Sequence, residues 1–128
     1  MSSIISLQIG ENILNTETKT NVAVSLESTS NKSVGTYTFD LSKILPNDGY
    51  VYEIYLSQYA CGDSHADIFY RTDIQGEIRA CELLTNMTNF FIMEVGKERK
   101  LYQYIRMYNV PYIALIITGY RRIRKYGE

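Results

Sequence analysis

The feature that most limits the fold of this chain is an alternation of apolar and polar side chains with a period of two residues. In segment 50–60, Tyr52, Ile54 and Leu56 share one face of an extended chain, and the other face carries Glu53, Tyr55, Ser57 and Tyr59. Similar short segments recur along the chain, and each ends at Gly, Asn, Asp or Pro. This pattern is typical of strands with one buried face, and its repetition predicts an all-β sandwich or barrel.

Further strands are predicted from the same alternation. They cover residues 22–26, 36–41, 66–74, 78–84, 90–95, 101–108 and 112–123. Residues 15–33 are rich in Asn, Thr and Ser, so we expect exposed loops around the short strand 22–26. We expect Pro111 to end the strand 101–108. Segment 112–123 is apolar on both faces as far as Ile117, which predicts a central strand.

We therefore predict an antiparallel β-sandwich, jelly-roll-like, with about eight strands. At 128 residues the chain has the length of one domain and can bury a core without disulfides. We assign residues 15–128 to one sandwich domain and residues 1–14 to an N-terminal strand or docking arm. Helical signals are weak, because 11–17 and 42–45 are long enough for only one turn each.

Residues with catalytic or metal-binding chemistry are few. His65 is the only histidine, and it follows Cys61 in the segment Cys61-Gly62-Asp63-Ser64-His65. Zinc takes three or four nitrogen or sulfur ligands, and this pair supplies two. A Cys–His nucleophile would need a third group to orient the base. Carboxylates such as the pairs 63/67 and 48/53 arise by chance at this density of acidic residues. We predict that the protein is not an enzyme and needs no metal or cofactor.

Charge is distributed unevenly around the formal net value of −1. Residues 1–96 carry a net charge of −7 and residues 97–128 carry +6. The basic end is either a surface for an acidic partner or a set of solvated strand faces, and we favour the second reading. Overall acidity opposes contact with a phosphate backbone, so nucleic acid ranks last among the partners.

Membrane and export signals are absent from the pattern of the chain. The apolar run 113–117 is far too short to span a bilayer. The first residues lack the basic segment and long apolar stretch of a secretory signal. We expect Cys61 and Cys81 to remain thiols in a reducing compartment.

Tyrosine and arginine gather toward the C-terminal end of a chain that has 12 Tyr and no Trp. The candidate contact residues are Tyr102, Tyr104, Arg106, Tyr108, Tyr120, Arg121 and Arg122. The first four share one face of a predicted strand. Such residues anchor subunit interfaces, pack across strands, stack on sugar rings or stack on bases. An interface and plain cross-strand packing rank equally here, ahead of sugar binding.

The segment Thr36-Tyr37-Thr38-Phe39-Asp40-Leu41-Ser42, followed by Leu45-Pro46-Asn47-Asp48-Gly49-Tyr50 and Tyr52-Glu53-Ile54, resembles a pattern in small β-sandwich virion proteins of tailed bacteriophages. Those proteins are head fibres and auxiliary capsid proteins, including those of crAss-like phages. The final segment Gly119-Tyr120-Arg121-Arg122-Ile123 is similar to their closing strand.

The resemblance implies a structural protein of the virion, assembled in the host cytoplasm. It implies self-association, commonly as a trimer, and attachment to a capsid or another virion protein. The chain lacks a heptad or collagen-like stalk, which favours a capsid-bound knob or decoration protein over a complete fibre. The alternative is a carbohydrate-binding or host-receptor-binding module, in which Tyr55, Tyr59 or Tyr70 would stack on glycan rings.

Overall fold

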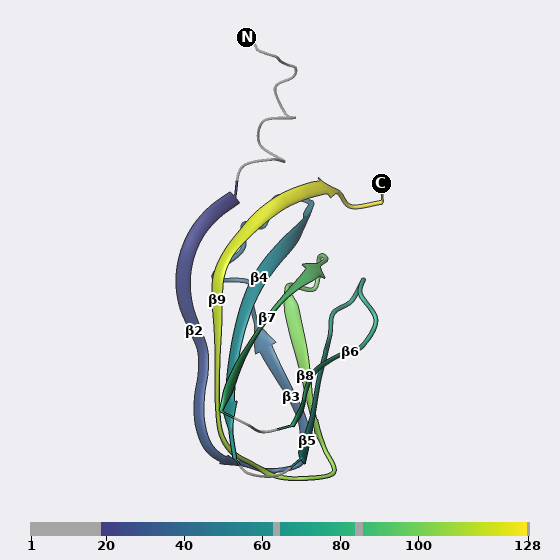
Figure 1. Cartoon of the computed structure of the whole chain (residues 1–128). Coiled ribbons are helices and arrows are strands. Elements are labelled where there is room, and N and C mark those ends of the chain that lie inside the picture. The colour runs from purple at the N-terminus through teal and green to yellow at the C-terminus, as the bar shows by residue number, and fades with distance from the viewer. Residues whose placement is uncertain (1–18, 63–64, 84–85, 128) are drawn as a thin grey trace.

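The computed structural model describes residues 19–62, 65–83 and 86–127, which form two four-stranded antiparallel sheets packed face to face (Figure 1). We name each sheet after its two central strands. The β4–β9 sheet contains, in order, β2 (Lys19–Lys32), β9 (Val110–Lys125), β4 (Tyr50–Cys61) and β7 (Met87–Val95). The β5–β8 sheet contains β3 (Gly35–Asp40), β8 (Lys100–Arg106), β5 (His65–Arg71) and β6 (Ile78–Leu83). The predicted fold class is confirmed.

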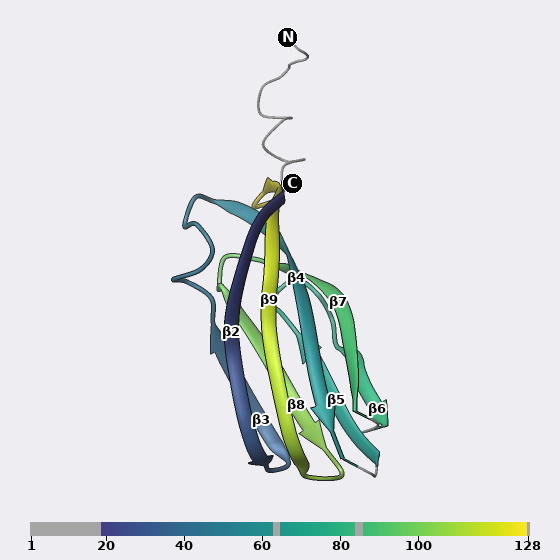
Figure 2. The ribbon, with the colours of Figure 1, turned by 60° about the vertical axis from the view of Figure 1, so that its left-hand side comes forward.

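The strand order is that of a jelly roll. Successive strands alternate between the two sheets except at the β5–β6 hairpin, so the chain winds around the sandwich. This winding places β2, the first described strand, directly beside β9, the last one (Figure 2). Two Greek keys of four strands that wrap in this way define the jelly-roll architecture.

The core lies between the sheets and follows from the alternation along each strand. In β4 the side chains of Ile54 and Leu56 are buried, whereas those of Tyr55 and Ser57 on the opposite face are half-buried. Burying each Leu or Ile side chain stabilises the fold by about 1.5–3 kcal/mol. The largest fully buried side chains come from both sheets and from Leu41, which follows β3: Tyr52, Tyr70, Leu41, Ile54, Leu56, Ile68, Met93, Leu101, Ile105, Ile113 and Leu115.

The structure corrects several predicted strand ends. β2 runs through 19–32 rather than forming a short strand in loops, because β9 gives it a partner along its whole length. The strand β8 ends at Arg106, where Met107 takes a positive φ of 75°. Pro111 therefore does not end β8. It lies near the start of β9, where a strand tolerates proline. β5 ends at Arg71, which leaves Ile74 in a loop with 44% of its surface exposed.

Other predictions are confirmed or fall outside the described residues. β9 lies between β2 and β4, as expected for a central strand. The segment after Leu41 forms one turn, in which the N–H groups of Ile44 and Leu45 donate to the Leu41 carbonyl. The predicted N-terminal strand or arm over 1–14, and the turn over 11–17, lie outside the described residues.

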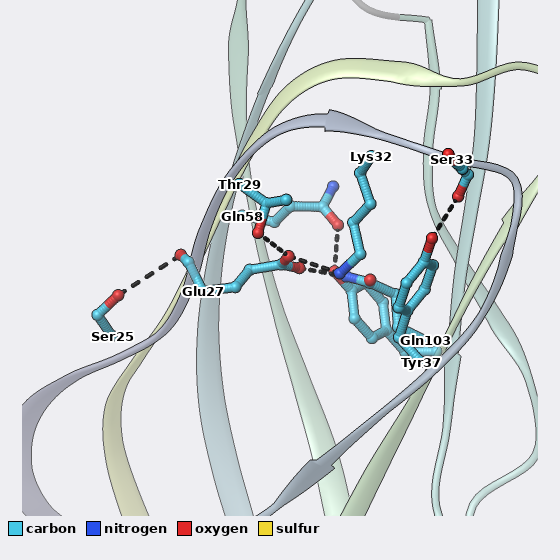
Figure 3. Close-up of polar contacts among 9 residues, drawn as sticks. Ser25, Glu27, Thr29, Lys32, Ser33, Tyr37, Gln58 and Gln103 are labelled. Carbon is cyan, nitrogen blue, oxygen red and sulfur yellow. Dashed lines mark hydrogen bonds and ion pairs between the residues drawn. The ribbon is translucent and has the colours of Figure 1, made fainter.

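A buried polar network joins the two sheets (Figure 3). In the β4–β9 sheet, the Lys32 ammonium lies 2.5 Å from the carboxylate of Glu27, and both side chains are 6% exposed. From β8, Gln103 Nε2 donates to Glu27 Oε2 at 2.7 Å and to the Tyr70 hydroxyl at 2.8 Å. The Tyr70 hydroxyl donates in turn to Gln58 Oε1 on β4 at 2.5 Å. The chain of hydrogen bonds therefore crosses the sandwich twice.

Aromatic rings and burial complete this network. The Lys32 ammonium lies 4.0 Å from the centroid of the Tyr37 ring and 5.2 Å from that of Phe39, which offsets part of its desolvation. Burial raises the pKa of the Tyr70 hydroxyl, so it stays protonated and remains a hydrogen-bond donor. A charged pair in a core is retained only where its hydrogen bonds are made, and here Glu27 accepts from Lys32, Thr29 and Gln103.

Candidate interaction surface

The outer face of the β5–β8 sheet brings together residues from strands that are distant in sequence. Along β8, Leu101, Gln103 and Ile105 point into the core, so Tyr102, Tyr104 and Arg106 lie on the outer face. The register places Tyr104 opposite Phe69 of β5, and Tyr102 opposite Arg71. On the far side of β5, Arg79 of β6 lies opposite Phe69.

Guanidinium groups alternate with aromatic rings across this face. Arg71 lies 4.3 Å from the centroid of the Tyr102 ring, and its Nε donates to the Tyr104 hydroxyl at 2.6 Å. Arg106 lies 5.1 Å from the ring of Tyr104 and 4.6 Å from that of Phe69. The Arg79 guanidinium, from β6, lies 5.2 Å from the centroid of the Phe69 ring. We call these residues the arginine–aromatic surface: Phe69, Arg71, Arg79, Tyr102, Tyr104 and Arg106.

Two of the three arginines are neutralised by carboxylates at the rim of the surface. Arg106 donates to both oxygens of Glu77 at 2.9 and 2.6 Å, which raises the pKa of Arg106. Arg79 lies 3.4 Å from Asp67 and 3.5 Å from Glu82. These pairs are partly exposed, so each contributes little stability and chiefly orients its arginine.

Arg71 differs from the other two arginines. Within the described part of the chain, no carboxylate lies at ion-pair distance from its guanidinium, although Tyr102 and Tyr104 hold the group in place. The Tyr102 hydroxyl donates to Glu98 at 2.8 Å, which raises the pKa of Tyr102 and fixes this ring under Arg71. Arg71 is therefore positioned in advance by the two tyrosines.

The structure separates the predicted contact residues into two groups. Tyr108 follows β8 in a turn, is 48% exposed, and donates its N–H to the Arg106 carbonyl. Tyr120, Arg121 and Arg122 belong to β9 in the other sheet. Phe69, Arg71 and Arg79 were missed, because only the pairing of β5 with β8 and β6 makes them neighbours of Tyr104.

The β9 residues make contacts within the chain. The Tyr120 ring packs edge-on against Tyr52, with centroids 5.6 Å apart. Arg121 pairs with Glu53 at 3.1 Å, and Arg122 Nε lies 3.9 Å from Asp48. These two carboxylates, one of the pairs considered for catalysis, are thus engaged by arginines.

Asp48 also holds the end of β4. Its Oδ2 accepts a hydrogen bond from the Tyr52 hydroxyl at 2.5 Å, and Arg99 lies 3.5 Å from Oδ1. Burial and the bond to Asp48 raise the pKa of Tyr52 to about 12. The arrangement fixes the β3–β4 turn to the end of the sandwich.

The residues considered for metal, thiol and glycan chemistry are only partly described. Within 19–62, 65–83 and 86–127, no cluster of His, Cys, Asp and Glu is arranged to hold a metal ion. Cys61 is a free thiol, and residues 63 and 64 between it and His65 lie outside the described residues. The described residues include no helix long and apolar enough to cross a membrane.

The prediction that Tyr70 stacks on a glycan ring is wrong. Tyr70 is completely buried, since its position on β5 points into the core, so it cannot contact a sugar ring. Tyr55 and Tyr59 lie on the outer face of β4 and are half-buried. The Tyr55 hydroxyl donates to Glu53 at 2.7 Å, and the Tyr59 ring lies 6.1 Å from that of Tyr112.

Comparisons with known proteins give a structural likeness only. No family model matches the chain. No curated protein matches it significantly. A chain from the cryo-EM structure of the giant freshwater prawn Macrobrachium rosenbergii extra small virus (XSV) VLP is similar with a TM-score of 0.44 and 11% sequence identity. The match covers 80% of this chain and 77% of that chain.

Proposed function

We propose that this protein is a non-enzymatic structural protein of a virion, which self-associates and attaches to another virion protein. The observation that carries the proposal is the arginine–aromatic surface on the outer face of a jelly roll. Jelly rolls serve as viral capsid and lectin domains, but an architecture alone does not set a function. The function therefore depends on what this surface can bind.

Its composition and rigidity suit a protein partner. Tyr and Arg are enriched among the residues that dominate binding energy at interfaces. The Arg71 guanidinium is already held between two tyrosines, so little side-chain freedom would be lost on association. A carboxylate of a partner would complete the ion pair that Arg71 lacks among the described residues.

The finer form of the proposal is a capsid decoration protein or head-fibre knob of a tailed bacteriophage, with trimeric association favoured. It includes one sandwich domain over residues 15–128 and a docking arm over residues 1–14. The sequence resemblance supports these details. The protein would be located in the virion after assembly in the host cytoplasm.

Light scattering over a dilution series tests this surface in the full chain. We expect the Arg71→Ala/Tyr104→Ala variant to lose mass relative to the wild-type oligomer. A matched control, Tyr112→Ala/Lys125→Ala, removes one tyrosine and one basic residue from β9 in the other sheet and should keep the wild-type mass. If the first variant keeps the wild-type mass, the arginine–aromatic surface is not the contact.

The alternative is a carbohydrate-binding or host-receptor-binding module. It is favoured by the partly exposed rings of Tyr55 and Tyr59 on the outer face of the β4–β9 sheet. A glycan array separates the two functions, because a binding module would select particular glycans and would lose them on Tyr59→Ala. An absence of glycan selection together with self-association would support the structural role.

A further inference from the structure

Strand β7 lies at the edge of its sheet (Figure 2). It carries three apolar side chains that are exposed to solvent. Phe90 is 76% exposed, Met87 is 55% exposed and Ile92 is 49% exposed. Phe90 and Ile92 lie on the outer face, opposite Ser57 and Tyr55 of β4. Apolar side chains that gather on one exposed edge strand, rather than lying singly on the surface, are typical of a contact site.

The backbone of β7 is also open along this edge. Glu94 shows the direction: its N–H donates to Gln75 Oε1 at 2.7 Å, and its carbonyl accepts from the Thr72 hydroxyl at 2.5 Å. In an antiparallel pair alternate residues face the same edge, so the N–H and C=O groups of Thr88, Phe90 and Ile92 face it too. Those groups have no hydrogen-bond partner among the described residues.

The other three edges of the sandwich are interrupted or short. β2 has two register shifts in its pairing with β9, and β6 pairs irregularly with β5. β3 and β6 span six residues each, and β6 carries Arg79 and Glu82. Proteins commonly prevent strand pairing at edges by such bulges, charges and short lengths. β7 pairs with β4 without a shift over 87–95 and has no charged residue from Asn86 to Met93.

We propose that β7 pairs antiparallel with β7 of a second copy of this chain, about a twofold axis at Phe90. In this register Phe90 faces its own copy, and each Ile92 faces Thr88, so the free backbone groups of both strands are paired. Glu94 faces the uncharged Asn86, so like charges do not meet. The loop that caps Glu94 ends the pairing. Such an interface uses the same patch on both subunits, which a twofold axis requires.

This contact deepens the proposed self-association and is separate from the arginine–aromatic surface. A second copy is the best occupant, because the stretch between Asn86 and Glu94 is complementary to itself in both apolar character and charge. In a virion protein, one contact of each kind would link copies in two directions.

Charged substitutions of Phe90, at the proposed axis, test the proposal. The measurement is sedimentation velocity of the full chain. In Phe90→Lys or Phe90→Glu, like charges would face each other, so we expect the dissociation constant of this contact to rise at least about tenfold. An equimolar mixture of the two variants should recover association, since Lys then faces Glu. Ser30→Lys, at an exposed position of β2 on the other edge of the same sheet, is the matched control and should leave the mass unchanged.

Each result decides the question. Wild-type mass in Phe90→Lys would overturn the β7 contact, while the Arg71→Ala/Tyr104→Ala variant would still test the proposed function by itself. Loss of mass in both single variants without recovery in the mixture would show that β7 contacts a different segment of the second copy and would overturn the β7–β7 pair. Association that disappears on deleting residues 1–18 but not in Phe90→Lys would assign the contact to the N-terminal segment. A wild-type chain that is monomeric at every concentration would overturn both self-association and the β7 pair.

Discussion

A Glu27→Gln substitution would change the centre of the buried network from a pure acceptor of hydrogen bonds into a group that also donates. In the wild-type protein, Lys32, Thr29 and Gln103 all donate to the two oxygens of Glu27. A glutamine amide would direct an N–H toward one of these donors. The substitution would also leave the Lys32 ammonium, 6% exposed, without its counter-ion.

Removing one partner of a buried ion pair typically costs about 3–5 kcal/mol, because the remaining charge is uncompensated. The cation–π contacts of Lys32 with Tyr37 and Phe39 reduce that cost, so we expect about 3 kcal/mol at Glu27→Gln. A domain of this size is stabilised by about 5–15 kcal/mol in total, so the variant should fold but unfold at lower denaturant concentration.

Urea unfolding followed by circular dichroism measures this change, provided that the m-value stays constant. The control is Glu27→Leu/Lys32→Met, which removes both charges and should recover most of the stability lost in Glu27→Leu. A loss below about 1 kcal/mol in Glu27→Gln, or a double variant no more stable than Glu27→Leu, would refute the argument that the pair acts as a compensated unit.

Three further predictions concern the ends and the core of the sandwich. Because the pKa of Tyr52 is raised from 10.0 to about 12 in the folded state, the unfolded chain loses this proton first, and stability falls as pH rises through that interval; Tyr52→Phe should flatten this part of a pH series of unfolding free energies. Gly96→Ala should destabilise by about 1–2 kcal/mol in thermal unfolding, because its Cβ would collide with the Asp73 carboxylate that accepts the Gly96 N–H. Leu115→Ala removes a completely buried side chain in central strand β9 and should cost about 2–5 kcal/mol in urea unfolding.

The alternation along the chain was sufficient to predict the faces of the strands. In β4, the three residues that were predicted to share the core face are buried: Tyr52, Ile54 and Leu56. Alternation failed for much of β2, whose Asn, Glu and Lys residues have low strand propensity, because pairing with β9 outweighs local preference. Tyr70 was predicted to stack on a glycan at the surface, but its hydroxyl is bonded to Gln58 and Gln103 in the core, and these partners become neighbours only in the folded chain.

The candidate surface was only half predictable. Tyr102, Tyr104 and Arg106 follow from spacing two residues apart on one strand. Arg71 joins them only because the register pairs it with Tyr102, and registers between distant strands are set by the packing of the whole fold. For the same reason, the sequence could not show that Arg121 and Arg122 of β9, which were grouped with the β8 residues, lie in the other sheet.

The neighbouring positions of β2 and β9 have a consequence for biosynthesis. β9 is the partner of both β2 and β4, and it is the last strand of the described chain to leave the ribosome. Contacts between segments so far apart in sequence close the largest loops and form slowly. A nascent chain that has not reached Lys125 would expose the edges of both β2 and β4. The sandwich must therefore close after translation of β9. A translation arrest within that strand would leave a chain prone to aggregate.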